Sequence, residues 1–286
     1  MIDIDRMDQQ LTAALTDKVG ALPSPAPVPI PALAPRRGER VVPAPMRSPV
    51  PSSAVDLLEL GLLAEADATM AASSHPRHAL TWGTMRALFA GHQEAARTGV
   101  EELRRLAQRT DDPSAWDHYW IQRYWLGFEW GTEGERYDIV DHCRQRAYRF
   151  GDQAWWGNLT LLLAATGKHD EAIRAFDATV RLPLEGHAPD VVTNLIEAAA
   201  LLGDAARVAA VLPALPKWEG RLVVVGQGVV CKGSVDRYRA LGLGALGRCE
   251  EAADSFRSAE SVHRALGAGP LLTRTLQQAA RTPVAA

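Results

Sequence analysis

The sequence predicts an all-α protein built from repeated helix pairs. Apolar residues recur at helical spacing from residue 54 onward, and glycines interrupt the chain at nearly regular intervals. Only one short stretch has the composition of β-strands. The chain of 286 residues is 47% hydrophobic and 23% charged, which is typical of a globular protein with a sizeable core.

Residues 1–53 differ in composition from the rest. In residues 1–20, Ile4, Leu11 and Leu15 lie seven and four residues apart, a spacing compatible with a short amphipathic helix. Residues 21–53 hold ten of the 18 prolines, and proline removes a backbone donor and disfavours helix. We expect residues 21–53 to form a disordered, proline-rich arm, either a spacer or a ligand for a partner.

The helical domain is predicted to begin with residue 54 and to extend to residue 282. Ser53 can cap a first helix in which Val55, Leu58, Leu62 and Ala66 share one apolar face. The helical segments that follow are about 13 to 20 residues long and end at Gly or Asp-Pro.

One stretch interrupts the helical pattern. Leu222–Val225 and Val229–Cys231 flank the sequence Gly-Gln-Gly, which predicts either a small hairpin or an irregular loop.

The helix-ending glycines are periodic. Their separations are 40, 36, 36 and 44 residues, close to the length of two short helices and two turns, for Gly91, Gly131, Gly167, Gly203 and Gly247. One helix pair cannot cover its own apolar face, so pairs of this length stack in series. We therefore predict a right-handed α-solenoid of about five helix hairpins.

Two segments carry a recognisable repeat frame. In GNLTLLLAATGKHDEAIRAFDATVRLP, Gly167 is followed by Ala172 and Phe176 and preceded by Trp156, and RYRALGLGALGRCEEAADSFRSAE repeats the frame. This pattern resembles a tetratricopeptide repeat. The resemblance implies that the first helix of each pair lines a concave, partner-binding surface.

The last third resembles a narrower group. An apolar LVVVG run, a Val-Cys-x-Gly turn, LGRxxEAxxxF and a closing GA-P-LxRT helix are similar to the C-terminal helical-repeat region of large bacterial signal-transduction ATPases. The resemblance covers residues 75–282 and implies a regulatory protein-binding scaffold. The sequence has neither GxxxxGK[ST] nor a helix-turn-helix signal, so the ATPase, cyclase and DNA-binding domains of that group are not expected.

Composition argues against several classes of protein. A net charge of −3 argues against nucleic acid as a partner. The longest apolar runs fall short of the roughly 18 residues of a membrane span, and the first residues are too polar for a signal peptide. Three cysteines, Cys143, Cys231 and Cys249, without CxxC spacing favour reduced thiols in a cytoplasmic protein.

The candidate chemical motifs are weak. The glycines at 226 and 228 lack the lysine spacing of a phosphate loop, and His75 and His78 have no further metal ligand nearby. His142 and Cys143 are adjacent, so they point to different sides of a helix. We therefore expect no enzyme, no catalytic residue, no metal and no cofactor.

A cluster of aromatic residues supplies the binding candidates. Seven aromatics fall within residues 116–130, and Trp120 lies on the line that can enter the core. The repeat frame directs His118, Trp125 and Glu129 toward the concave groove, and it places Arg237 at an equivalent position. Packing between helix pairs is the default role for these aromatics, and a binding groove that uses Trp125 is the alternative.

Two functions follow from this sequence. The leading hypothesis is a non-enzymatic scaffold that binds a protein or peptide in the concave groove, in a regulatory or signalling role. An aromatic with an acid and a histidine beside it suits a peptide with an apolar anchor and a positive charge. The alternative is a small-molecule sensor or accessory subunit of a larger complex, with a pocket near Trp125 and residues 220–234.

Overall fold

The computed structural model describes residues 53–73, 75–149, 153–181, 184 and 187–282. In these residues helices dominate and the only sheet has two short strands, which confirms the all-α prediction. The predictions for residues 1–20 and 21–52 lie outside the described residues. All described residues belong to one compact unit, Pro49–Ala286.

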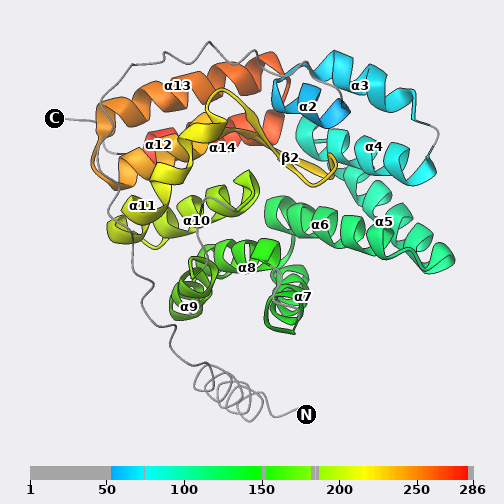
Figure 1. The fold of residues 1–286 in the computed structure, drawn as a ribbon, viewed down its shortest axis with the longest axis horizontal. Coiled ribbons are helices and arrows are strands. Elements are labelled where there is room, and N and C mark those ends of the chain that lie inside the picture. Colours follow the sequence, from blue (N-terminus) through cyan, green and yellow to red (C-terminus); the bar gives the residue numbers. More distant parts are fainter. Residues whose placement is uncertain (1–52, 74, 150–152, 182–183, 185–186, 283–286) are drawn as a thin grey trace, which may run out of the picture. The chain divides into compact units, whose positions relative to one another are not determined.

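Successive helices pack against each other in pairs (Figure 1). The pairs are α2 (Ala54–Glu59) with α3 (Leu63–Ala71), α4 (Pro76–Ala90) with α5 (Gln93–Thr110), α6 (Pro113–Trp130) with α7 (Glu133–Arg144), α8 (Gln153–Ala165) with α9 (His169–Thr179), α10 (Pro189–Leu201) with α11 (Ala205–Val211), and α12 (Val235–Ala245) with α13 (Cys249–Ala265). Further helical elements are the π-helix η1 (Gln145–Arg149), the 3₁₀ turns η3 (Leu212–Ala214) and η4 (Pro216–Trp218), and α14 (Gly269–Arg281).

The predicted glycines lie where the first helix of a pair ends. Gly91, Gly167, Gly203 and Gly247 have φ of +86°, +76°, +67° and +74°. After each of them the next residue donates a backbone hydrogen bond to the carbonyl five positions earlier. This is the Schellman helix end, which favours glycine because an L side chain is strained there. Gly131 differs, with φ of −72° in extended backbone.

The first predicted helix is divided in two. Ser53 caps α2 through a reciprocal capping box with Asp56, as its side chain accepts from the Asp56 N–H at 3.1 Å. The apolar line then breaks at Gly61, where φ is +76° and the chain turns into α3. Local turn chemistry ends this helix before the apolar spacing does.

The stretch that interrupts the helices is an antiparallel hairpin, named here the central hairpin. It consists of β1 (Leu222–Val225) and β2 (Val230–Ser234), and all nine strand residues are buried. β1 contacts α2 and α10, while β2 contacts α4, α6, α12 and α13. We call the surfaces of α4, α6, α10 and α12 that contact this hairpin the inner face. The hairpin thus occupies the side on which a concave groove was predicted.

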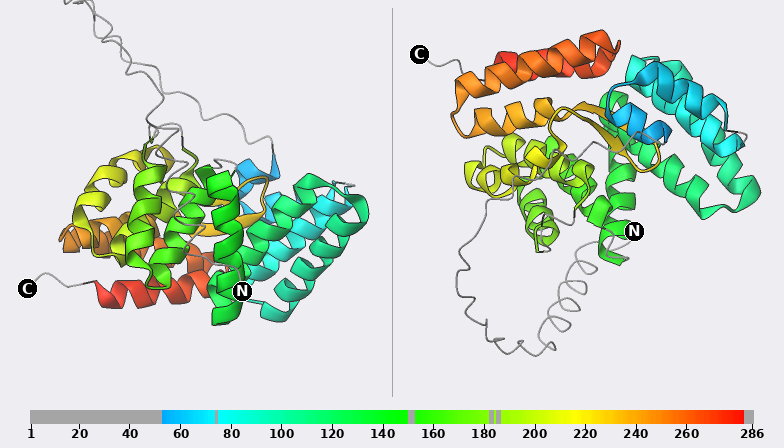
Figure 2. Two further views of the ribbon diagram at one scale, coloured as in Figure 1. Left: turned by 90° about the horizontal axis from the view of Figure 1, so that it is seen from below. Right: turned by 45° about the horizontal axis from the view of Figure 1, so that its top comes forward.

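Helix α14 adds a further layer beside the inner face. It packs against α13, and in the right view of Figure 2 the two lie next to each other at the C-terminal end of the chain. α14 also contacts α4, where the Pro270 ring lies 3.0 Å from the position that a Cβ on Gly91 would take. The last described helix therefore meets one of the first.

Candidate functional site

The predicted groove residues lie on two helices of the inner face. His118, Trp125 and Glu129 belong to α6, and Arg237 belongs to α12. Glu129 and Arg237 join one polar network, and Trp125 lines the same small hollow as Glu129. His118 lies two helical turns away from Trp125 and outside the network, with Nδ1 3.0 Å from Thr81 Oγ1.

The exposure of the two tryptophans is the reverse of what the repeat frame predicts. Trp125 is only 5% exposed, because the central hairpin covers the side of α6 that would face an open groove. Trp120 is half-buried, and its ring stacks on His142 with centroids 3.7 Å apart. The expected burial of Trp120 and exposure of Trp125 are therefore wrong. Partner binding at these residues stays a prediction.

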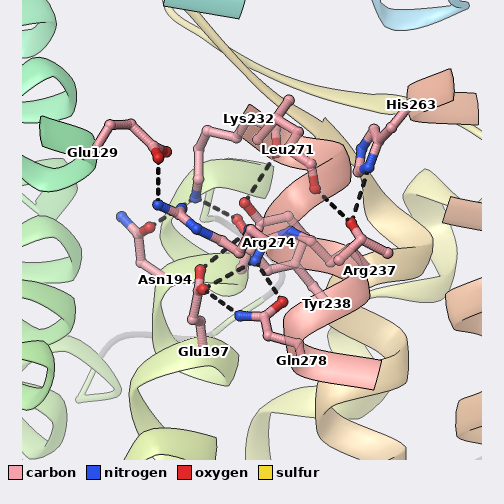
Figure 3. A network of polar contacts seen from close by, with 12 residues as sticks. Glu129, Asn194, Glu197, Lys232, Arg237, Tyr238, His263, Leu271, Arg274 and Gln278 are labelled. Carbon is pink, nitrogen blue, oxygen red and sulfur yellow. Dashed lines mark hydrogen bonds and ion pairs between the residues drawn. The ribbon is translucent and has the colours of Figure 1, made fainter. Parts of the chain in front are cut away.

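A buried ion pair forms the centre of the network (Figure 3). Arg237 on α12 donates to both carboxylate oxygens of Glu197 on α10, at 2.9 and 3.2 Å, and both side chains are at most 4% exposed. Burial alone would raise the pKa of Glu197, but Arg237 and Arg274 lower it to about 2. Paired donors on both oxygens keep this carboxylate charged in the interior.

Lys232 adds a second buried cation, supplied by β2 of the central hairpin. Its Nζ donates to Thr193 Oγ1 and Asn194 Oδ1, both at 2.7 Å, and to Asp190 O at 3.1 Å. Desolvation lowers the pKa of Lys232 to about 7. Because three acceptors satisfy all three N–H bonds of the ammonium group, Lys232 fastens the hairpin to α10.

Lys232 also lies between two aromatic rings. Its Nζ is 5.2 Å from the Trp125 ring centroid and 5.0 Å from that of Tyr238. Both distances fit cation–π contact, so Trp125 contributes to holding this charge.

Helix α14 completes the network from the other side. Arg274 pairs with Glu129 at 2.7 Å, and its guanidinium carbon lies 4.8 Å from the Phe128 ring centroid. Gln278 donates to Glu197 Oε1 at 3.0 Å. Burial raises the pKa of Glu129, while Arg274 and Arg237 oppose that rise.

Gln278 also accepts from the buried guanidinium of α12. Arg237 Nη1 donates to Gln278 Oε1 at 3.0 Å, so both ends of the Gln278 amide are used. α14 thus touches both acids and one arginine of the inner face.

A further polar contact beside the central hairpin involves His263. His263 Nε2 accepts from the Ser234 N–H at 2.9 Å, which leaves Nδ1 to carry the proton and donate to Thr275 Oγ1 at 3.0 Å. Desolvation, followed by Arg237, lowers the pKa of His263 to about 3. This neutral imidazole joins α13, α14 and the hairpin.

A hollow of about 20 Å³ lies beside the network, lined in part by Trp125, Glu129, Lys232 and Arg274. That volume is close to one water molecule and too small for a metabolite. Across the described part of the chain, no three or more His, Cys, Asp or Glu side chains are grouped to hold a metal ion. In this conformation the network serves to hold α14 and the hairpin.

A larger hollow lies on the outer side of α12. It measures about 330 Å³ and is mainly apolar, with a Glu219–Arg239 ion pair of 2.6 Å beside it. The residues lining it come from α11, η3, η4 and α12 and from their flanks: Ala209, Leu212, Pro213, Leu215, Pro216, Glu219, Val235, Asp236, Arg239, Leu243, Leu246 and Arg248. We call it the outer groove.

Sequence reasoning missed Glu197, Lys232, Arg274 and Gln278. Two of them had a signal, because Glu197 is the one acid in the apolar run LIEAAALL and Lys232 follows the apolar run VVVGQGVVC. A charge inside a buried segment requires a buried partner. The partners on α14 had no such signal, because charged and amide side chains are ordinary in an amphipathic helix.

Comparisons with protein-family models, curated proteins and solved structures find no match to this chain. The resemblances noted in the sequence therefore stay predictions. Each helix among the described residues is too short or too polar to traverse a lipid bilayer.

Proposed function

We propose that this protein is a non-enzymatic interaction scaffold that binds a helical peptide segment of a partner protein. In this proposal residues 54–282 form a right-handed solenoid of about five tetratricopeptide-like hairpins. The main support for this proposal is the way α14 contacts the inner face. An amphipathic helix places an arginine on Glu129 and a glutamine between Glu197 and Arg237.

These contacts match the recognition of a helix in a groove. Such recognition uses side chains three, four and seven residues apart on one helix face. The inner face supplies carboxylates, a buried guanidinium and aromatic surface to a helix of that kind. A regulatory or signalling role follows from the resemblance of the last third to bacterial signal-transduction chains.

Site-resolved photocrosslinking in the source cell tests this function. We expect the full chain with Phe128→p-benzoylphenylalanine to form an adduct with a partner protein, because residue 128 adjoins the Arg274–Glu129 pair. Tyr137→p-benzoylphenylalanine is the matched control, since this exposed aromatic on α7 lies outside the network. Equal adducts at both positions, or no protein adduct at residue 128, would contradict the proposal.

The outer groove favours a second function, that of a small-molecule sensor or accessory subunit. Its volume of about 330 Å³ lies at the lower end of ligand pockets, and apolar side chains predominate in its lining. A thermal-shift screen with metabolites tests this function, because a ligand at 100 times its Kd stabilises a protein by about 2.7 kcal/mol. Leu246→Trp, which fills the groove, should abolish any such shift and leave peptide binding intact.

A further inference from the structure

Helix α14 joins the inner face mainly through polar contacts. Among its thirteen residues, Leu271 and Thr275 are the buried ones, while Leu276 is 44% exposed. Leu271 packs into an apolar cluster that includes Trp82 and Phe89. A helix that buries so little apolar surface depends on specific polar pairs for its position.

The contacting side chains of α14 lie on one helix face. Leu271, Arg274, Thr275 and Gln278 have the spacing i, i+3, i+4 and i+7, which brings them to one side of an α-helix. Leu271 supplies an apolar anchor, and Arg274, Thr275 and Gln278 contact the inner face and His263 through the bonds described above. Figure 3 shows Arg274 and Gln278 pointing from α14 toward Glu129 and Glu197.

Charge fixes what can occupy this place. Glu197 keeps Arg237 as its partner whether or not α14 is present, whereas the ion pair of Glu129 is made by Arg274. A half-buried carboxylate that loses its cation carries a desolvation cost. An occupant must therefore present a cation to Glu129, as the guanidinium of Arg274 does.

Two buried N–H donors at the contact between α14 and the inner face lack hydrogen-bond acceptors in the described part of the chain. Arg274 Nη1 and Arg237 Nε are buried, and neither has a hydrogen-bond acceptor among the described residues. Buried donors without an acceptor weaken an interface. Arg274 leaves with α14, whereas Arg237 Nε stays on the inner face, so an external helix with an acceptor beside Arg237 would gain a bond that α14 lacks.

We propose that α14 is an internal ligand that occupies the partner-binding groove in cis. The partner presents a helix with the same side chains, Leu-x-x-Arg-Thr-x-x-Gln, and displaces α14 when it binds. This inference rests on the proposed scaffold function and names the chemistry of its partner.

Tethering explains why the groove is closed in the isolated chain. The turn between α13 and α14 spans only Leu266–Ala268, and a short tether holds a ligand at an effective concentration on the order of millimolar. An external helix therefore binds weakly until the contacts of α14 are reduced.

Peptide binding to the full chain tests the proposal. The probe is a fluorescein-labelled peptide of residues 268–282, followed by fluorescence anisotropy. We expect Arg274→Ala with Gln278→Ala to weaken α14 in cis, so that the peptide binds this variant at least about tenfold more tightly than wild type. Thr273→Ala with Gln277→Ala, on the exposed side of α14, is the matched control and should bind like wild type.

Two further arms identify the groove. A peptide carrying the same Arg274→Ala and Gln278→Ala changes should not bind, and Glu129→Gln added to the α14 variant should abolish binding. Equal affinity for variant and wild type, or binding of the altered peptide, would overturn the proposal.

Hydrogen exchange of the wild-type chain covers the case in which the α14 variant fails to fold. Excess unlabelled peptide should speed exchange of the α14 amides, because displaced helix loses protection. Unchanged exchange would overturn the proposal, and so would a concentration-dependent dimer that exchanges α14 between copies. A partner adduct at residue 128 without any peptide binding would leave the scaffold function standing and refute only the internal-ligand role of α14.

Discussion

Acidification should weaken the fold through one buried histidine, His263. Its Nε2 accepts from the Ser234 N–H, and protonation of the imidazole removes that acceptor. Because the folded pKa is about 3 and the ordinary value is 6.5, the unfolded chain binds more protons below pH 6.5. The contribution of His263 to the unfolding free energy is therefore fully present above pH 6.5 and is lost as the pH drops from 6.5 toward 3.

The size of the effect follows from the shift. Each pH unit in that range costs about 1.4 kcal/mol for one such group, so a change from pH 7 to pH 5 costs about 2 kcal/mol. His118 and His142, with pKa values of about 4 after burial, add to the total slope. Wild type and a His263 variant both contain His118 and His142, so the difference between their pH dependences gives the contribution of His263.

The matched variant is His263→Gln, whose amide oxygen can still accept from Ser234 but does not titrate. Urea unfolding followed by circular dichroism at pH 7, 6 and 5 should give wild type a loss about 2 kcal/mol larger than that of the variant. Equal losses would refute the reasoning. So would NMR titration of the wild-type imidazole with a midpoint between pH 6 and 7, a test that requires no variant.

Three further changes test the packing. Trp125→Ala should cost about 3–5 kcal/mol of unfolding free energy and Trp120→Ala less, as measured by urea denaturation, because only Trp125 is buried. Glu197→Ala should cost about 3–5 kcal/mol in the same assay by leaving the Arg237 charge buried without a carboxylate, and Glu197→Leu with Arg237→Met should recover part of that loss, since Gln278 then loses both of its partners. Gly233→Ala should lower the Tm in scanning calorimetry, since φ is +83° and the new Cβ would lie 2.3 Å from an imidazole nitrogen.

The helix ends were predictable because their causes are local. A Schellman end requires left-handed backbone, and glycine at positions such as Gly167 and Gly203 marks that requirement in the sequence itself. The same chemistry at Gly61 divided α2 from α3, where apolar spacing alone predicted one helix. Local turn residues were therefore better guides than hydrophobic period.

The interior was less predictable because it depends on tertiary contacts. The repeat frame directed Trp125 toward a groove, but an open groove and a filled one give the same helical spacing. Burial of Trp125 follows from the central hairpin, whose strand character the sequence left open. Glu129 and Arg237 were named as candidates on one groove, yet their link through α14 required the three-dimensional structure.

Burial of its charges also explains how this groove could select its occupant. In an open solenoid the charges of the inner face would be hydrated, and an ion pair there would contribute little. The Glu197–Arg237 pair and Lys232 are buried, and pairing is stronger in such surroundings. The same desolvation penalises a helix that lacks a cation for Glu129, so it acts against wrong partners more than it favours the right one. In the proposed scaffold, this buried setting is thus also what would make recognition of a partner helix specific.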